Sequence, residues 1–287
     1  MEKFCEGNWH DDMKSAMLED SLNLASAYSI QQGEGSPVIL IHGAAASVHD
    51  WDDLIPELTK NNHTSYALDL LGHGGSPKPN SRTYQMSWMY DHFSNWMQSL
   101  RLTEPAVLIG HSMGGYLALE YARRVPAWTR GLILVNPLYS RLQLPFFLRS
   151  EFATTLSGAI AWYTPERLFR FFVDIGSRAT GHGIGGSHSL PEHVRAQTTF
   201  DYKRTAPGIY NAPHTMDDLT DRASTITTPT LLVWGDRDPT LSPSSFPKLL
   251  NAMPRASGKA FRAGHVPHQS NIDEFNQVVI EFLRGLE

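Results

Sequence analysis

The chain of 287 residues contains a single cysteine, Cys5, so no disulfide can form within it. Its longest uninterrupted apolar run, Ala159 to Tyr163, has five residues, whereas a membrane-spanning helix needs about 18 or more. Basic residues are not in excess, because the formal net charge is −5, and such a balance gives no sign of nucleic-acid binding. These scarcities exclude a disulfide scaffold, a membrane span and a strongly basic nucleic-acid binder.

The segment from Met1 to Lys14 has four acidic residues and no apolar stretch of the kind that a secretory signal needs. The lone cysteine suits a reducing compartment. Both observations predict a cytoplasmic protein. With 41% hydrophobic residues, the chain is long enough to bury a substantial core.

The most informative segment is Gly110-His111-Ser112-Met113-Gly114, which matches the pattern G-x-S-x-G. It stands between an apolar run at 106–109 and a helix-like segment at 116–124. A tight turn from strand to helix strains its middle residue, and glycine on both sides removes the Cβ atoms that would collide. The pattern presents Ser112 as a nucleophile. The simpler alternative makes it a helix N-cap after a glycine-rich turn.

A nucleophile elbow requires an acid later in the chain, followed by a histidine. The apolar run at 231–234 predicts a buried strand, and Asp236 and Asp238 follow it before Pro239. The carboxyl ends of parallel strands carry catalytic groups in open α/β folds. Asp238 is favoured as the acid because it stands further into the loop. Either aspartate alone could simply start a turn, and Asp236 fits that structural role better.

Two histidines, His265 and His268, follow a short strand-like segment near 259–261. Gly264 gives the backbone freedom to aim the His265 ring, and Pro267 stiffens the exit from the loop. Placement at the strand end favours His265 as the base, with His268 as its competitor.

A candidate oxyanion hole follows the apolar run at 38–41, where His42-Gly43 leads into three alanines. Small residues let the backbone approach a substrate oxygen, so the N–H groups of Ala44 and Met113 are the candidate donors. Taken alone, His42-Gly43 is more simply a turn that ends a strand.

Together, the elbow, the acid, the histidine and the Ala44 turn resemble the α/β-hydrolase superfamily, of the capped serine esterase and lipase type. Two further segments carry the resemblance. Asp69 to Ser76 is similar to the loop after the fourth strand of that family, and Gly114 to Ala122 is similar to the helix behind the elbow. The resemblance implies an α/β fold in which helices cover both faces of a mostly parallel central sheet.

The hydrophobic periodicity predicts the same alternation of strands and helices. After an antiparallel opening near 22–32, we expect strands at 37–41, 65–70, 106–109, 131–135, 230–234 and 258–261. Helical patterns cover 51–60, 86–100, 113–124, 244–252 and about 272–286.

This alternation stops after Asn136-Pro137, and strands resume only at Pro229. We therefore predict a core domain in two parts, residues 1–138 and 213–287, with a helical cap inserted at 139–212. The insert holds 12 of the 30 aromatic residues. Most should pack the cap against the core, and roughly a third should line an apolar substrate pocket. Those considered are Phe146, Phe147, Trp162, Tyr163, Phe169, Phe171 and Phe172.

The insert carries eight Lys and Arg against five Asp and Glu, a formal +3 that leaves −8 on the remainder. This skew could favour an acidic substrate, yet solvated surface charges explain it equally well. Gly181 to Gly186 matches G-x-G-x-x-G but lacks the preceding strand and the following helix, so we expect a cap loop and no dinucleotide site. His182, His188 and His193 are spread too loosely to indicate a metal site.

The resemblance implies a carboxylesterase that acts on small-molecule esters of short to medium acyl chains, through an acyl-enzyme, with no cofactor and no metal. A serine at position 112 disfavours the aspartate-nucleophile branches of the superfamily. Carbon–carbon bond hydrolases of meta-cleavage products typically have asparagine and tryptophan where this chain has His111 and Val266. Such a hydrolase, a cofactor-free perhydrolase or haloperoxidase, and a non-enzymatic ligand-binding homologue stay open as alternatives, as does a homodimer.

Overall fold

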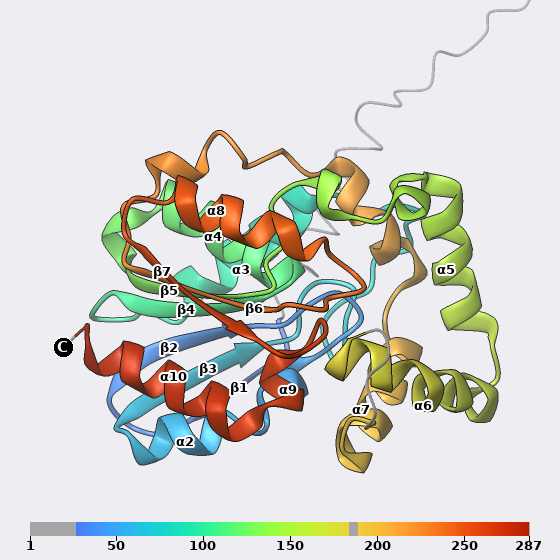
Figure 1. The fold of residues 1–287 in the computed structure, drawn as a ribbon, viewed down its shortest axis with the longest axis horizontal. Helices are drawn as coiled ribbons and strands as arrows, with labels where there is room; N and C mark the ends of the chain where they lie inside the picture. The colour runs from blue at the N-terminus through green and yellow to red at the C-terminus, as the bar shows by residue number, and fades with distance from the viewer. Residues whose placement is uncertain (1–26, 184–188, 287) are drawn as a thin grey trace, which may run out of the picture.

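The computed structural model describes residues 27–183 and 189–286. A seven-stranded sheet forms its centre, in the order β1-β3-β2-β4-β5-β6-β7 (Figure 1). Only β1 is antiparallel to its neighbour, and every other pair is parallel. The strands are β1 Ser29–Gln32, β2 Ser36–Ile41, β3 His63–Leu68, β4 Ala106–His111, β5 Thr129–Val135, β6 Thr230–Gly235 and β7 Ala256–Phe261. Cys5, the first fourteen residues and His188 lie outside the described residues.

The sheet is buried on both faces, which explains why its inner strands are continuous apolar runs. One hydrophobic cluster lies between the sheet and helices α3, α4 and α8, and a second lies between the sheet and helices α2 and α10 (Figure 1). The predicted mostly parallel sheet with helices on both faces is confirmed. These helices are α2 Ile55–Lys60, α3 Met86–Ser99, α4 Met113–Arg124, α8 Phe246–Ala252 and α10 Ile272–Arg284.

Two predicted elements differ from the structure. The continuous helix expected at 51–60 is wrong, because a short 3₁₀ turn, η1 Val48–Trp51, precedes helix α2, which has a proline in its first turn. The strand expected at 65–70 begins at His63 and ends at Leu68. Leu70 leaves the sheet because its N–H donates to His42 Nε2 at 2.9 Å instead of to a strand.

Residues 139–212, which we call the inserted segment, contain helices and no strand in their described part. The helices are α5 Glu151–Tyr163, α6 Glu166–His182 and α7 Glu192–Lys203. It also contains the 3₁₀ segments η3 Arg141–Gln143 and η4 Phe146–Arg149, and a third, η5 Pro207–Thr215, begins in it and ends three residues beyond it. α5 and α6 form the side of the molecule that is furthest from the sheet in Figure 1. The division into a core domain and a cap stays a prediction.

The G-x-G-x-x-G match begins at the end of a helix. Gly181 lies in the last turn of α6, and Gly183 ends that helix with a φ of 85°. The rest of the match extends outside the described residues. A helix therefore stands where a dinucleotide-binding motif needs a strand.

Within residues 27–183 and 189–286, no helix is both long and apolar enough to cross a membrane.

The packing of α10 on the sheet gives a test of the fold. Phe275 is fully buried, with its ring 6.5 Å from that of Phe261. We expect Phe275→Ala to lower the free energy of unfolding by about 3–5 kcal/mol, because it leaves a cavity as well as losing apolar burial. Urea denaturation measures this, with Gln277→Ala on the exposed side of α10 as the control. An equal loss in both variants would contradict the assigned packing.

Candidate active site

The four predicted site elements lie at one edge of the sheet. Ser112 follows β4 directly, Asp238 follows β6, His265 follows β7, and Ala44 follows β2. These strands are parallel, so their carboxyl ends meet at the same edge. The fold alone thus brings together residues that are far apart in the sequence.

The turn at Ser112 is strained. Ser112 has a φ of 51° and a ψ of −111°, a conformation that is costly for a residue with a side chain. A Cβ on Gly110 would lie 2.4 Å from the carbonyl oxygen of Gly114, and a Cβ on Gly114 would lie 2.1 Å from that of Ile41. Both contacts are with backbone that cannot give way. The glycines are therefore required by the packing of this turn.

Asp238 and His265 form a direct hydrogen bond, with 2.7 Å between Asp238 Oδ2 and His265 Nδ1. Asp238 also accepts hydrogen bonds from Asn136 Nδ2 at 2.6 Å and from the N–H groups of Thr240 and Leu241. Burial acts to raise the pKa of the Asp238 carboxyl, but His265 and these donors outweigh it and hold that pKa below its usual value. Asp238 is an ionised hydrogen-bond acceptor for His265.

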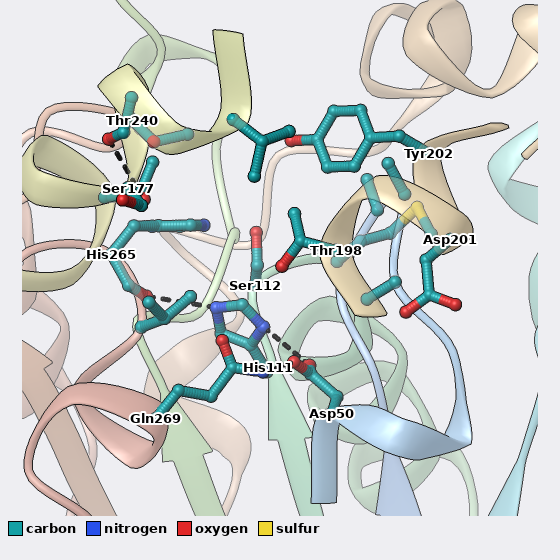
Figure 2. Close-up of a pocket in the computed structure, with 18 of the residues that line it drawn as sticks. Asp50, His111, Ser112, Ser177, Thr198, Asp201, Tyr202, Thr240, His265 and Gln269 are labelled. Carbon is teal, nitrogen blue, oxygen red and sulfur yellow. Dashed lines mark hydrogen bonds and ion pairs between the residues drawn. The ribbon is translucent and has the colours of Figure 1, made fainter. Parts of the chain in front are cut away.

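Ser112 and His265 line the same cavity. Figure 2 shows the nitrogen end of the His265 ring directed toward the side of the Ser112 hydroxyl. Among the described residues, no hydrogen bond joins these two side chains. Such contacts are often long in the absence of a substrate.

The structure also separates the competing candidates. Asp236 is exposed and lies near Arg237, with 3.9 Å between the charged groups. His268 is buried and its Nε2 lies 3.2 Å from Oδ1 of Asp50. Neither candidate reaches the pair formed by Asp238 and His265.

The loop after β2 is held by two buried histidines. His42 Nε2 accepts the N–H of Leu70, and His73 Nε2 accepts the N–H of Ala45 at 3.1 Å. Burial lowers the pKa of both rings, which keeps them neutral and able to accept. The N–H groups of Ala44 and Met113 make no hydrogen bond within the described part of the chain, and both residues line the cavity.

The inserted segment holds the loop that carries His265. The N–H of His265 donates to the carbonyl oxygen of Thr180 at 2.7 Å, and the N–H of Gly264 donates to that of Gly181 at 2.8 Å. Both acceptors lie in the last turn of α6, where carbonyl groups lack partners within the helix. The α6 helix end is therefore part of the support of His265.

A second buried carboxylate, Asp50, lies behind this group and was missed by the sequence reasoning. Its Oδ2 lies 3.0 Å from His111 Nδ1, and its Oδ1 accepts from Gln269 at 2.8 Å in addition to the contact with His268. His111 Nε2 lies 3.1 Å from the carbonyl oxygen of His265 (Figure 2). Asp50 is 61 positions before His111, so only the fold could reveal the pair.

Asp50 is held in its ionised form by the rings around it. Burial acts to raise the pKa of Asp50, but the His268 and His111 rings outweigh it and hold that pKa well below its usual value. His111 thus faces an ionised carboxylate on one ring nitrogen and a carbonyl oxygen on the other. Asp50 and His111 therefore form a buried, hydrogen-bonded pair directly next to Ser112.

The same cluster has the residue types of a metal site. The candidate ligand atoms of Asp50, His111 and His268 lie within 4.8 Å of one another, and all three residues are buried. Their mutual hydrogen bonds account for this arrangement. Burial lowers the pKa of the His268 ring.

A cavity of about 600 Å³ opens above Ser112 and lies between the strand ends and the inserted segment. Neither Lys nor Arg is among its described lining residues, whereas Asp50, Asp52, Asp53 and Asp201 are. The basic excess of the inserted segment therefore lies away from the cavity, and it offers no support for an acidic substrate.

Helix α7 supplies the polar side of this cavity. Thr198 and Tyr202 extend toward Ser112, whereas the carboxylate of Asp201, which also lines the cavity, is directed away from it (Figure 2). Asp201 is buried and accepts a hydrogen bond from Gln197 at 2.9 Å. Burial raises the pKa of Asp201 to about 7. Its charge therefore changes near neutral pH.

The aromatic residues of the inserted segment divide into some that line the cavity and others that are exposed. Phe169 and Phe172 line the cavity, as do Tyr202 and Tyr210. The expectation that most of the others pack against the core is wrong. The side chains of Phe146, Phe147, Trp162, Tyr163 and Phe171 are all exposed.

Comparison with known proteins places these observations in a family. The Hydrolase_4 family model, described as serine aminopeptidase, S33, matches residues 35–273. Lipase 1 from Psychrobacter immobilis is 27% identical over 274 residues, which cover 91% of this chain and 82% of the lipase.

Solved structures share the fold. An esterase from Thermogutta terrifontis superposes with a TM-score of 0.73 at 24% identity, covering 91% of this chain and 93% of the esterase. A bromoperoxidase from Bacillus anthracis gives a TM-score of 0.76 at 19% identity, covering 90% of this chain and 95% of the other. These likenesses confirm the predicted α/β-hydrolase fold.

The buried pair of Asp50 with His111 predicts a pH-dependent stability. We expect Asp50→Asn to lower the free energy of unfolding at pH 7 by about 3 kcal/mol or more, because it removes the ionised partner of two buried imidazole rings. The folded pKa of Asp50 is depressed, so its contribution is present above the unfolded pKa of about 3.9 and is lost as the pH falls through the folded value.

Urea denaturation of both proteins between pH 7 and pH 3 measures this difference. Asp52→Asn, at a half-exposed neighbour, is the control and should change stability by less than about 0.5 kcal/mol. A gap between wild type and Asp50→Asn that stays constant down to pH 3 would contradict a paired, ionised Asp50 in the folded protein.

Proposed function

Because the chain belongs to the Hydrolase_4 family of α/β-hydrolases, described as serine aminopeptidase, S33, we propose that it is a serine hydrolase that cleaves carboxylic esters. The observation that carries this proposal is the placement of Ser112 at a strained turn in the cavity, with His265 on the same cavity and hydrogen bonded to Asp238. In this proposal Ser112 is the nucleophile, His265 the base and Asp238 the acid.

The proposed steps follow from the donors and acceptors. His265 donates its Nδ1–H to Asp238, which leaves Nε2 free to take the proton of Ser112 as the hydroxyl oxygen attacks the ester carbonyl. The Ala44 and Met113 N–H groups bind the oxyanion that forms. His265 then gives its proton to the leaving alcohol as the carbon–oxygen bond breaks. Water repeats the two steps on the acyl-enzyme and releases the acid.

The charge of the cavity supports a neutral substrate. Substrates of meta-cleavage hydrolases are acids, and a perhydrolase acting with acetate binds an anion; either would meet aspartates and no described Lys or Arg. Because like charges repel, this lining disfavours both alternatives. A volume of about 600 Å³ has the scale of a pocket for a small molecule. We propose neutral esters of short to medium acyl chains.

A second candidate is a peptidase that acts next to a free amino group. Two observations favour it: the description of the family as serine aminopeptidase, and the acidic lining of the cavity, which would attract a substrate ammonium group. The proposed nucleophile and base would serve both reactions, so the two are separated by substrate and not by site.

Removal of the Ser112 hydroxyl tests the proposal. We expect Ser112→Ala to lower kcat for a nitrophenyl ester by at least about a thousandfold, because the nucleophile is lost. A panel of nitrophenyl esters of increasing chain length, with an aminoacyl nitroanilide beside them, measures the turnover of each candidate substrate.

Ser224→Ala, at an exposed serine far along the chain, is the matched control and should retain full activity. Labelling of wild type, but not of Ser112→Ala, by a fluorophosphonate would support the same role. Unchanged ester turnover in Ser112→Ala would overturn the mechanism. Turnover of the anilide in preference to every ester would favour the second candidate.

The titration of Asp201 predicts that discrimination by charge depends on pH. A pKa of about 7 leaves Asp201 largely protonated at pH 6 and largely ionised at pH 8. We expect kcat/KM for a neutral ester to exceed kcat/KM for an ester with a terminal carboxylate. The ratio of the two values should grow about threefold or more between pH 6 and pH 8, because ionised Asp201 repels the substrate carboxylate. In Asp201→Asn this ratio should not change with pH. If the ratio grows equally in that variant, a group other than Asp201 causes the pH dependence.

A further inference from the structure

The exposed apolar side chains of this molecule are concentrated in one region. Among the described residues, thirteen of the fifteen exposed large hydrophobic side chains belong to the inserted segment, and the other two are Tyr28 and Trp128. Single exposed apolar residues are normal, whereas a contiguous group marks an interaction site. The inserted segment therefore carries the candidate interaction surface.

Helix α5 exposes its large apolar residues and buries its small ones. Phe152, Leu156 and Ile160 are spaced four residues apart, so they form one stripe, and they are 78%, 49% and 48% exposed. The buried side consists of Thr154, Gly158 and Ala161. These small residues pack against η5, where the Thr154 hydroxyl donates to Asn211 at 2.6 Å.

Helix α6 repeats the pattern. Phe171 and Ile175 are four residues apart and more than half exposed, while the buried residues are Ser177, Gly181 and one aromatic, Phe169. Phe146, in η4 before α5, is 88% exposed. A helix that only stabilised the fold would bury its bulky side chains and expose its small ones. We call the exposed apolar side chains of η4, α5 and α6 the apolar face.

The charge of the inserted segment limits what can cover the apolar face. The segment has a formal +3, and the remainder of the chain has −8. Two copies that met through this face would bring like charges together, which opposes association. An anionic lipid surface attracts the segment and repels the remainder of the chain, so it selects this orientation.

The apolar face also adjoins the cavity. Phe172 is 50% exposed and at the same time lines the cavity, and Leu148 of η4 lines it as well. In Figure 1, α5 and α6 lie on the side of the molecule away from the sheet, where a flat surface can reach them. A molecule that left a lipid surface would therefore meet apolar side chains along the way to Ser112.

From these four observations, we propose that the apolar face docks the protein on an anionic lipid surface. The aromatic side chains of η4, α5 and α6 enter the interface between head groups and acyl chains, and the protein lies on the membrane without crossing it. This proposal does not depend on the hydrolase activity, because it concerns binding alone.

Flotation of the full-length protein with vesicles tests the docking. We expect wild type to float with vesicles of phosphatidylcholine that contain about 30% phosphatidylglycerol, and to float at least about tenfold less with pure phosphatidylcholine. Phe146→Ser combined with Phe152→Ser should lower the bound fraction at least about tenfold, because two exposed apolar groups are lost. Neither phenylalanine lines the cavity, so turnover of a soluble nitrophenyl ester should stay at the wild-type level.

Trp128→Ser is the matched control, since Trp128 is 44% exposed in η2 at the amino end of β5, whereas the inserted segment begins after the carboxyl end of that strand. It should float as wild type does. The proposal is overturned if wild type stays unbound with both kinds of vesicle, or if the double variant floats unchanged. It is also overturned if sedimentation without lipid finds a wild-type dimer that the double variant cannot form, because a second copy is then the partner.

Discussion

The site depends on the close packing of one backbone turn between two strand ends. The strained Ser112 is held because its N–H donates to the carbonyl oxygen of Val135 at 2.9 Å, and its own carbonyl oxygen accepts from Leu138 at 2.9 Å. On the other side, the turn lies so close to β2 that only a glycine fits at position 114. Strain of this kind persists only where the surroundings over-determine it. The buried core of the sheet is what holds Ser112 in position.

Electrostatics around this turn are arranged as two carboxylate–imidazole pairs. Asp238 is paired with His265 and Asp50 with His111, and the two are joined where His111 meets the carbonyl oxygen of His265. The rings of His111 and His265 lie 4.9 Å apart. Each carboxylate is itself buried and is held ionised by the groups that face it. A substitution in either pair is therefore expected to change the position of the rings in the other.

Much of the fold could be predicted from the sequence, because hydrophobic periodicity and turn residues are local signals. The apolar run at 106–109 predicted β4, Gly110 and Gly114 predicted the turn at Ser112, and the order of the later motifs indicated the sheet edge. Asp50 gave no such signal, since its partners are 61 and 218 positions away. The orientation of α5 was also beyond reach: the pattern shows a bulky stripe, and the usual rule places such a stripe inside.

The hydrogen bond from His265 to the carbonyl oxygen of Thr180 has a consequence for how this chain can evolve. Segments inserted after a strand are commonly regarded as interchangeable modules that alter specificity while the core is conserved. Here the end of α6 supports the backbone of a core loop, so replacement of the whole segment would also remove a support of that loop. Divergence is freer at η4 and α5, which make no hydrogen bond to that loop within the described residues, than in the last turn of α6.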